Sequence, residues 1–166
     1  MSALPQTKPL LSAEAYRAID REIAKYPAEQ RRSAVMAALV IAQDELGWLS
    51  TETMDSVAGY LGMAPVAVYE VASFYTMYNL KPSGKYKLTI CTNLPCGLQG
   101  SLDAADHLKR GLGVEFNEAT PDGRFMVKEG ECMGACAMAP VILVNNKKMH
   151  DYMSHEKIDA LLKELK

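Results

Sequence analysis

The sequence has 166 residues, of which 49% are hydrophobic and 23% are charged, and its formal net charge at pH 7 is −2. It contains no apolar run of about 20 residues, the length that a membrane-spanning helix needs. It also lacks the basic patches interleaved with aromatic residues that are typical of nucleic-acid-binding proteins. The composition therefore predicts an ordinary soluble globular protein and excludes a membrane-spanning one.

The first 80 residues have the patterns of four helices. Ser12 and Ser50 are suitable N-caps for two of them, and Gly47 is a suitable C-terminal residue for another. Pro65 fits the first turn of the last helix, which is apolar nearly all round. This pattern favours the central helix of a small bundle, although a surface that contacts a partner would also produce it. The helices are predicted at about 13–26, 28–46, 51–61 and 65–78.

The pattern changes at residues 81–85 (KPSGK), which predict a break in regular structure. Strands and helices alternate after it, and Ser154 is a suitable N-cap for the last helix. The sequence therefore predicts an α+β protein, with an N-terminal helical domain at 1–80 and an α/β domain at 81–166. The second domain is predicted to contain strands at 86–91, 125–129, 141–144 and 147–150, and helices at about 97–110 and 155–165.

All four cysteines lie in the second region, as two close pairs. Cys91 and Cys96 form a C-x4-C motif, and Cys132 and Cys136 form a C-x3-C motif. Each pair follows a predicted strand, so we expect both pairs at one end of the sheet. Residues 1–5 lack the features of a secretory signal, which favours reduced thiols over disulfides. Neither motif has the C-x2-C spacing of a thioredoxin-type dithiol.

A structural zinc ion and an iron–sulfur cluster remain as alternatives for these cysteines. Structural zinc sites commonly use C-x2-C turns that direct two sulfurs at one ion. The wider loops of this sequence suit a [2Fe–2S] cluster better, because such a cluster needs two thiolates on each iron. Gly134 and its uncharged neighbours would also let backbone N–H groups approach the sulfurs. The spacing favours the cluster but leaves zinc open.

Together with further motifs, these pairs make the sequence resemble the thioredoxin-like [2Fe–2S] ferredoxin subunit of NADH:quinone oxidoreductase (respiratory complex I), called the E subunit in bacteria. The resemblance covers nearly the whole chain from about residue 12. It implies a thioredoxin-like α/β domain with a four- to five-stranded mixed sheet, in which Cys91, Cys96, Cys132 and Cys136 ligate one [2Fe–2S] cluster. The additional motifs are GW at 47–48, VASFY at 71–75, TPDGRF at 120–125, ECMGAC at 131–136 and APV at 139–141.

The resemblance also implies partners and a location. The N-terminal helices would pack beside a flavoprotein subunit that holds FMN and binds NADH, within the peripheral arm of the complex. No G-x-G-x-x-G motif follows a predicted strand here, so nucleotide binding is expected on that partner. We expect no catalytic residue on this chain and a cytoplasmic location, peripheral on the bacterial inner membrane, rather than a mitochondrial matrix.

One feature departs from what a cluster loop favours. Pro95 directly precedes Cys96 and removes one N–H group that could have pointed at a sulfur, so the reduction potential is not predicted. The alternative functions are the equivalent small subunit of an NAD-linked hydrogenase or formate dehydrogenase, and a zinc-stabilised interaction module. The three histidines, His107, His150 and His155, are predicted to have surface or capping roles.

Overall fold

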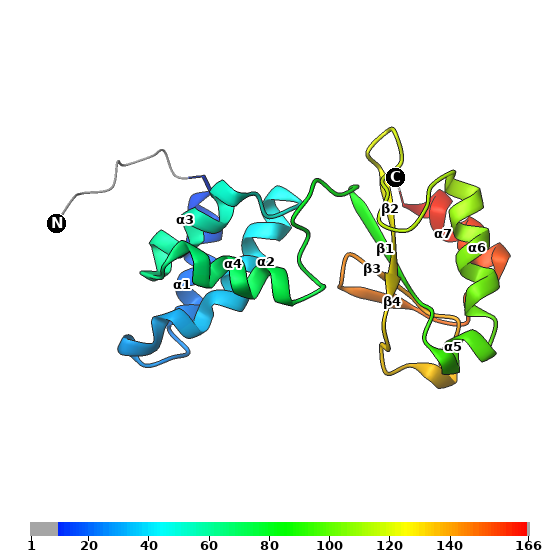
Figure 1. Cartoon of the computed structure of the whole chain (residues 1–166), viewed down its shortest axis with the longest axis horizontal. Helices are drawn as coiled ribbons and strands as arrows, with labels where there is room; N and C mark the ends of the chain where they lie inside the picture. The colour runs from blue at the N-terminus through cyan, green and yellow to red at the C-terminus, as the bar shows by residue number, and fades with distance from the viewer. Residues whose placement is uncertain (1–9, 166) are drawn as a thin grey trace. The chain divides into compact units, whose positions relative to one another are not determined.

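The computed structural model describes residues 10–165 (Figure 1). The chain divides into two compact units between residues 82 and 83, within the segment that the sequence marks as a break. Each unit has a hydrophobic core of its own. Residues 1–5, on which the expectation of reduced thiols was based, lie outside the described residues. Among the described residues, no helix is long and apolar enough to cross a membrane.

The first unit is helical, as the sequence predicts. The Oγ of Ser12 accepts a hydrogen bond from the backbone N–H of Ala15 at 3.1 Å, which confirms the first N-cap. Ser50 caps a later helix in the same way. Gly47 has a φ of 82° and ends the helix before it, a conformation that glycine adopts without strain. The elements of this unit are α1 (Ala13–Ile23), the 3₁₀ helix η1 (Ala28–Ala34), α2 (Val35–Leu46), α3 (Thr51–Leu61) and α4 (Pro65–Phe74).

Two of the predicted helices are shorter than expected. The predicted helix 28–46 is in fact η1 followed by α2, with a non-helical residue at Gln30 (φ −111°, ψ 22°). Residues 28–33 are all exposed and have no apolar face that packing could hold in an α-helix. The helix predicted to reach residue 78 ends at Phe74, because Tyr75 is extended.

Helix α4 is not the buried central helix of the bundle. Only Val68 and Ala72 on this helix are buried. Three large side chains of the same helix are mostly exposed, Val66 at 64%, Tyr69 at 51% and Phe74 at 77%. The prediction of a central helix is therefore wrong, and the observed exposure agrees with the alternative of a surface that contacts a partner.

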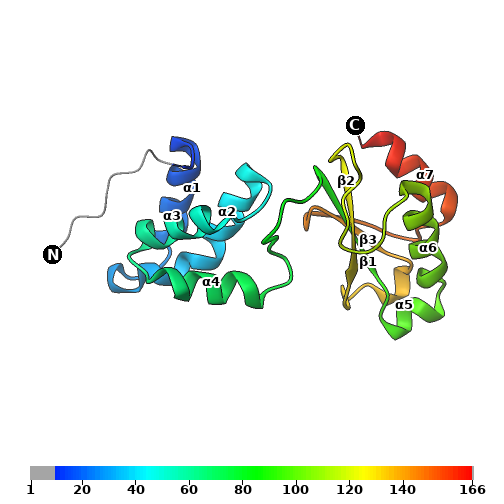
Figure 2. The same cartoon turned by 45° about the horizontal axis from the view of Figure 1, so that its top comes forward.

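The second unit is a four-stranded mixed sheet with helices on one face, which confirms the predicted fold class. Strand β1 pairs in parallel with β2 and antiparallel with β3, and β3 pairs antiparallel with β4. Helices α6 and α7 lie on the same side of the sheet in both views (Figures 1 and 2). The core lies between them and the sheet, and includes Leu88, Ile90, Leu108 and Ile158. The elements are β1 (Tyr86–Cys91), α5 (Leu94–Leu98), α6 (Ser101–Leu112), β2 (Phe125–Gly130), η2 (Cys136–Met138), β3 (Ile142–Val144), β4 (Lys148–His150) and α7 (His155–Glu164).

The helix predicted at 97–110 is broken. It consists of the short α5 and the longer α6, which are separated at Gly100, where φ is 89°. A left-handed residue cannot continue an α-helix, so the chain changes direction at this glycine. Cys96 consequently lies inside α5 instead of just before a long helix.

Candidate metal centre

The two cysteine pairs lie at the same end of the sheet, as predicted. Cys91 is the last residue of β1 and pairs with Gly130, the last residue of the parallel strand β2. Because parallel strands end at one edge, residues that follow β1 and β2 are brought close together. In both views α5 and the segment that contains η2 lie at this end (Figures 1 and 2). We call residues 91–96 the first cysteine loop and residues 132–136 the second.

Three of the four thiols form one buried group. Cys91 and Cys96 are 0% and 1% exposed, and they cluster with Ala135 and Val141, while the partly buried Cys136 packs against them. Burial raises the pKa of the Cys96 thiol to about 12, and hydrogen bonds and charge interactions with Cys91 and Cys136 contribute to the increase. Without a metal, Cys96 therefore stays protonated at neutral pH.

Cys132 is placed differently, because its side chain is exposed. The backbone N–H of Gly134 points at its sulfur, with an N–S distance of 3.4 Å. Gly134 has a φ of 71°, which lets the loop turn back toward Cys132. Across residues 10–165, no three His, Cys, Asp or Glu side chains are arranged so that they could hold one metal ion.

The donor set fits a [2Fe–2S] cluster. Such a cluster takes two thiolates on each of two irons, and hydrogen bonds to sulfur and burial set its potential. This chain provides two pairs of thiols at one edge, an apolar surround for three of them, and a backbone donor at the fourth. A structural zinc ion would instead need four donors around a single point.

Polar contacts between the two loops were not predicted from the sequence. The Thr92 hydroxyl donates to Oε1 of Glu129 at 2.7 Å, and the Asn93 amide donates to Oε2 of Glu131 at 3.4 Å. The Thr92 backbone N–H also donates to the carbonyl of Gly130 at 3.2 Å. The partners are 37 and 38 residues apart in the chain, so only the strand register could have revealed them.

Two of the histidines form a contact that the sequence did not reveal either. The rings of His107 and His155 stack with centroids 4.1 Å apart. Nε2 of His107 lies 2.8 Å from Asp159, and Nε2 of His155 lies 2.8 Å from Asp103. These pairs connect α6 to α7, which agrees with surface roles and gives no reason to add the histidines to the cysteine site.

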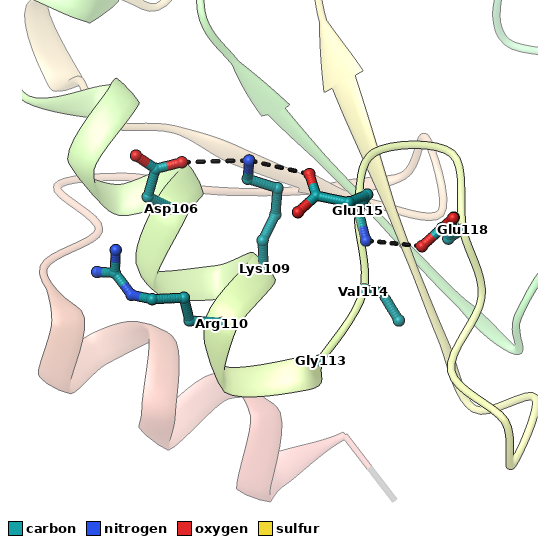
Figure 3. A pocket seen from close by; sticks show the side chains of 7 residues that line it. All are labelled: Asp106, Lys109, Arg110, Gly113, Val114, Glu115 and Glu118. Carbon is teal, nitrogen blue, oxygen red and sulfur yellow. Dashed lines mark hydrogen bonds and ion pairs between the residues drawn. The ribbon is translucent and has the colours of Figure 1, made fainter.

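A hollow of about 440 Å³ lies at the opposite end of α6 from the cysteine loops (Figure 3). Lys109 lies between Asp106 and Glu115, with its Nζ 3.2 Å from a carboxylate oxygen of each. These hydrogen bonds raise the pKa of Lys109, so that it stays charged and paired with its neighbours. The lining residues thus neutralise one another, and the hollow gives no support for a catalytic site.

The comparison with known families decides the classification. A family model described as thioredoxin-like [2Fe–2S] ferredoxin matches residues 19–166. The chain belongs to this family. The [2Fe–2S] cluster that gives the family its name is therefore the cofactor of this chain, and the predicted family and thioredoxin-like fold are confirmed.

Members with similar sequences are subunits of respiratory enzymes. The chain is 41% identical to NADH-quinone oxidoreductase subunit 2 of Thermus thermophilus over 144 residues, which cover 87% of this chain and 80% of that protein. It is 44% identical to the NADH-quinone oxidoreductase E subunit 2 of Rhizobium meliloti over 144 residues, covering 87% and 84%. Among solved structures, an NAD⁺-reducing [NiFe]-hydrogenase in the air-oxidised state shares the fold, with a TM-score of 0.69 and 22% identity over 79% of this chain and 22% of that chain.

Proposed function

We propose that this chain is the [2Fe–2S] subunit of an NADH:quinone oxidoreductase and exchanges single electrons with FMN on an NADH-binding partner subunit. The observation that carries the proposal is the identity above 40% to two NADH-quinone oxidoreductase subunits, over 87% of the chain in each case. An iron–sulfur cluster supplies one-electron chemistry, and the nicotinamide chemistry belongs to the partner.

The proposed ligands are Cys91, Cys96, Cys132 and Cys136. Their arrangement as two pairs at one edge of the sheet supports this assignment, as do the buried surroundings of three of them. The polypeptide around them would exclude water from the first pair and direct the N–H group of Gly134 at Cys132. Both effects stabilise bound thiolate sulfur.

The helical unit is proposed to contact the rest of the peripheral arm. The exposed apolar side chains of α4, Val66, Tyr69 and Phe74, support this role, since large apolar side chains gathered on one helix are typical of protein interfaces. As part of such an assembly the chain would lie on the cytoplasmic side of the bacterial inner membrane, without entering it.

The fold shared with the NAD⁺-reducing hydrogenase supports a second candidate, the equivalent subunit of an NAD-linked hydrogenase. The two candidates differ in their partners. Purification of the tagged chain from its own cells, followed by metal and flavin analysis, therefore separates them. We expect FMN, NADH-dependent quinone reduction and no nickel. A soluble assembly that contains nickel or molybdenum and does not reduce quinone would contradict the proposal.

A further inference from the structure

The two cysteine loops are joined by side chains that are not themselves metal ligands. We infer that Glu129 and Glu131 are positioning residues, which connect the second cysteine loop to the first through Thr92 and Asn93. The inference rests on the proposed ligand set. Its basis is the pair of hydrogen bonds between the loops, Thr92 to Glu129 at 2.7 Å and Asn93 to Glu131 at 3.4 Å.

These side chains act where the backbone pairing of the sheet ends. The register between β1 and β2 stops at Cys91 and Gly130, and one more backbone bond follows, from Thr92 to the carbonyl of Gly130. Beyond it, the only hydrogen bond recorded between the two chain segments in residues 10–165 is the one from Asn93 to Glu131. The contact between side chains therefore continues the alignment that the strands begin.

The exposed cysteine benefits most from this alignment. Cys91 is fixed by its place in the central strand, whereas Cys132 is exposed and has only the nearby N–H of Gly134 as a hydrogen-bond donor. Glu131 directly precedes Cys132, so a bond from Glu131 to the first loop limits how far Cys132 can move from Cys91. Side chains that orient metal ligands in this way are typical of metal centres.

The carboxylates also place negative charge beside the proposed cluster. A negative charge disfavours the addition of an electron to a nearby group, so each carboxylate lowers the reduction potential. The hydrogen bond and the charge can be separated by substitution. Glu129→Gln removes the charge and keeps an oxygen that can accept from Thr92, whereas Glu129→Ala removes both.

The experiment uses the full chain reconstituted anaerobically with iron and sulfide. The rate at which a chelator removes the cluster is measured for the wild type, Thr92→Val, Glu129→Ala and the double variant. We expect each single change to accelerate cluster loss roughly tenfold, and the double variant to lose its cluster no faster than either single variant. Thr92→Val preserves the shape of the side chain, which keeps the strand end folded. Glu164→Ala, an exposed carboxylate at the far end of α7, is the matched control.

Glu129→Gln gives the second readout. Its cluster should be retained nearly as well as that of the wild type, while its reduction potential, measured by EPR-monitored titration, should be higher. Wild-type rates of cluster loss in both single variants, or effects that multiply in the double variant, would overturn the inference while leaving the proposed function intact. A wild-type chain that forms no cluster at all would overturn both.

Discussion

The first and second cysteine loops solve the same task in opposite ways. In the first, Cys91 belongs to a strand with neighbours on both sides and Cys96 lies in a helix, so the fold itself buries both thiols. In the second, Cys132 is exposed and Cys136 is half-buried in a single 3₁₀ turn. The difference indicates that the first pair is a preformed half of the site, and that the second pair completes it from a loop.

The largest expected effects come from replacing one cysteine in each loop by serine. Both Cys91→Ser and Cys132→Ser should abolish the [2Fe–2S] spectrum, because serine is a poor substitute for a thiolate ligand. Only Cys91→Ser should also destabilise the cluster-free protein, by about 1–3 kcal/mol, since it buries a hydroxyl group in an apolar cluster. Iron and sulfide analysis and urea unfolding measure the two effects. A Cys132→Ser variant with full iron content would show that the ligand set is wrong.

The second prediction concerns the reactivity of the thiols in the cluster-free protein. At pH 8, iodoacetamide should modify Cys132 first and Cys96 last, because Cys132 is exposed while Cys96 is buried with a pKa of about 12. The two rates should differ by roughly a hundredfold or more, because only the thiolate reacts. Peptide mass spectrometry at timed intervals gives the order. Equal rates for both cysteines would remove the distinction between the loops.

The third prediction compares two tight glycines at opposite ends of β2. A Cβ at Gly130 would lie 2.7 Å from Cγ2 of Thr89 and 2.8 Å from Cε of Met133, whereas one at Gly84 would lie 2.5 Å from the backbone of Phe125. We expect each Gly→Ala change to destabilise the cluster-free protein by about 1–3 kcal/mol.

These two substitutions should differ in their effect on the cluster. Gly130 lies beside Cys91 and Met133, so Gly130→Ala should also accelerate cluster loss, whereas Gly84→Ala at the start of the sheet should not. Denaturant unfolding and chelator challenge measure the two quantities on the same samples. Faster cluster loss in both variants would mean that global stability, and not the loop, controls retention.

The smallest expected effect is on the pH dependence of stability. The pKa of Cys96 is raised from 9.0 to about 12 in the folded state, so the unfolded chain loses this proton first as the pH rises. The contribution of Cys96 is therefore fully present below pH 9 and is lost between pH 9 and 12, by about 1 kcal/mol per pH unit at first.

The measurement must be a difference, because Lys87 titrates in the opposite sense. Burial lowers the pKa of Lys87 to about 8, which makes the folded state more stable as the pH rises through the same range. The free energies of unfolding of the cluster-free wild type and of Cys96→Ala should therefore be compared at pH 8, 9 and 10. The same comparison with Cys132→Ala serves as control, and an equal change for both variants would contradict the burial of Cys96.

Strand positions and helix starts could be predicted from the sequence because their causes are local. Ser12, Ser50 and Ser154 cap helices through hydrogen bonds to residues three positions later, and β1 begins and ends where its alternation does. The end of the sheet at which the cysteines meet was also predictable, since Cys91 and Cys132 each follow a strand.

The misses have causes that the sequence does not show. The surface of α4 is as apolar as a core helix, so that its exposure depends on what packs around it. The break at Gly100 depends on a left-handed conformation that glycine permits but does not require. The contact between Thr92 and Glu129 depends on the register of two strands.

The most direct test of the account is the metal content of the full chain after anaerobic reconstitution. We predict two irons and two acid-labile sulfides per chain, a visible absorbance spectrum, and an EPR signal of one reduced [2Fe–2S] centre that appears only after reduction. A colourless protein with one tightly bound zinc ion and neither iron nor sulfide would contradict the central claim that these four cysteines hold a redox cluster.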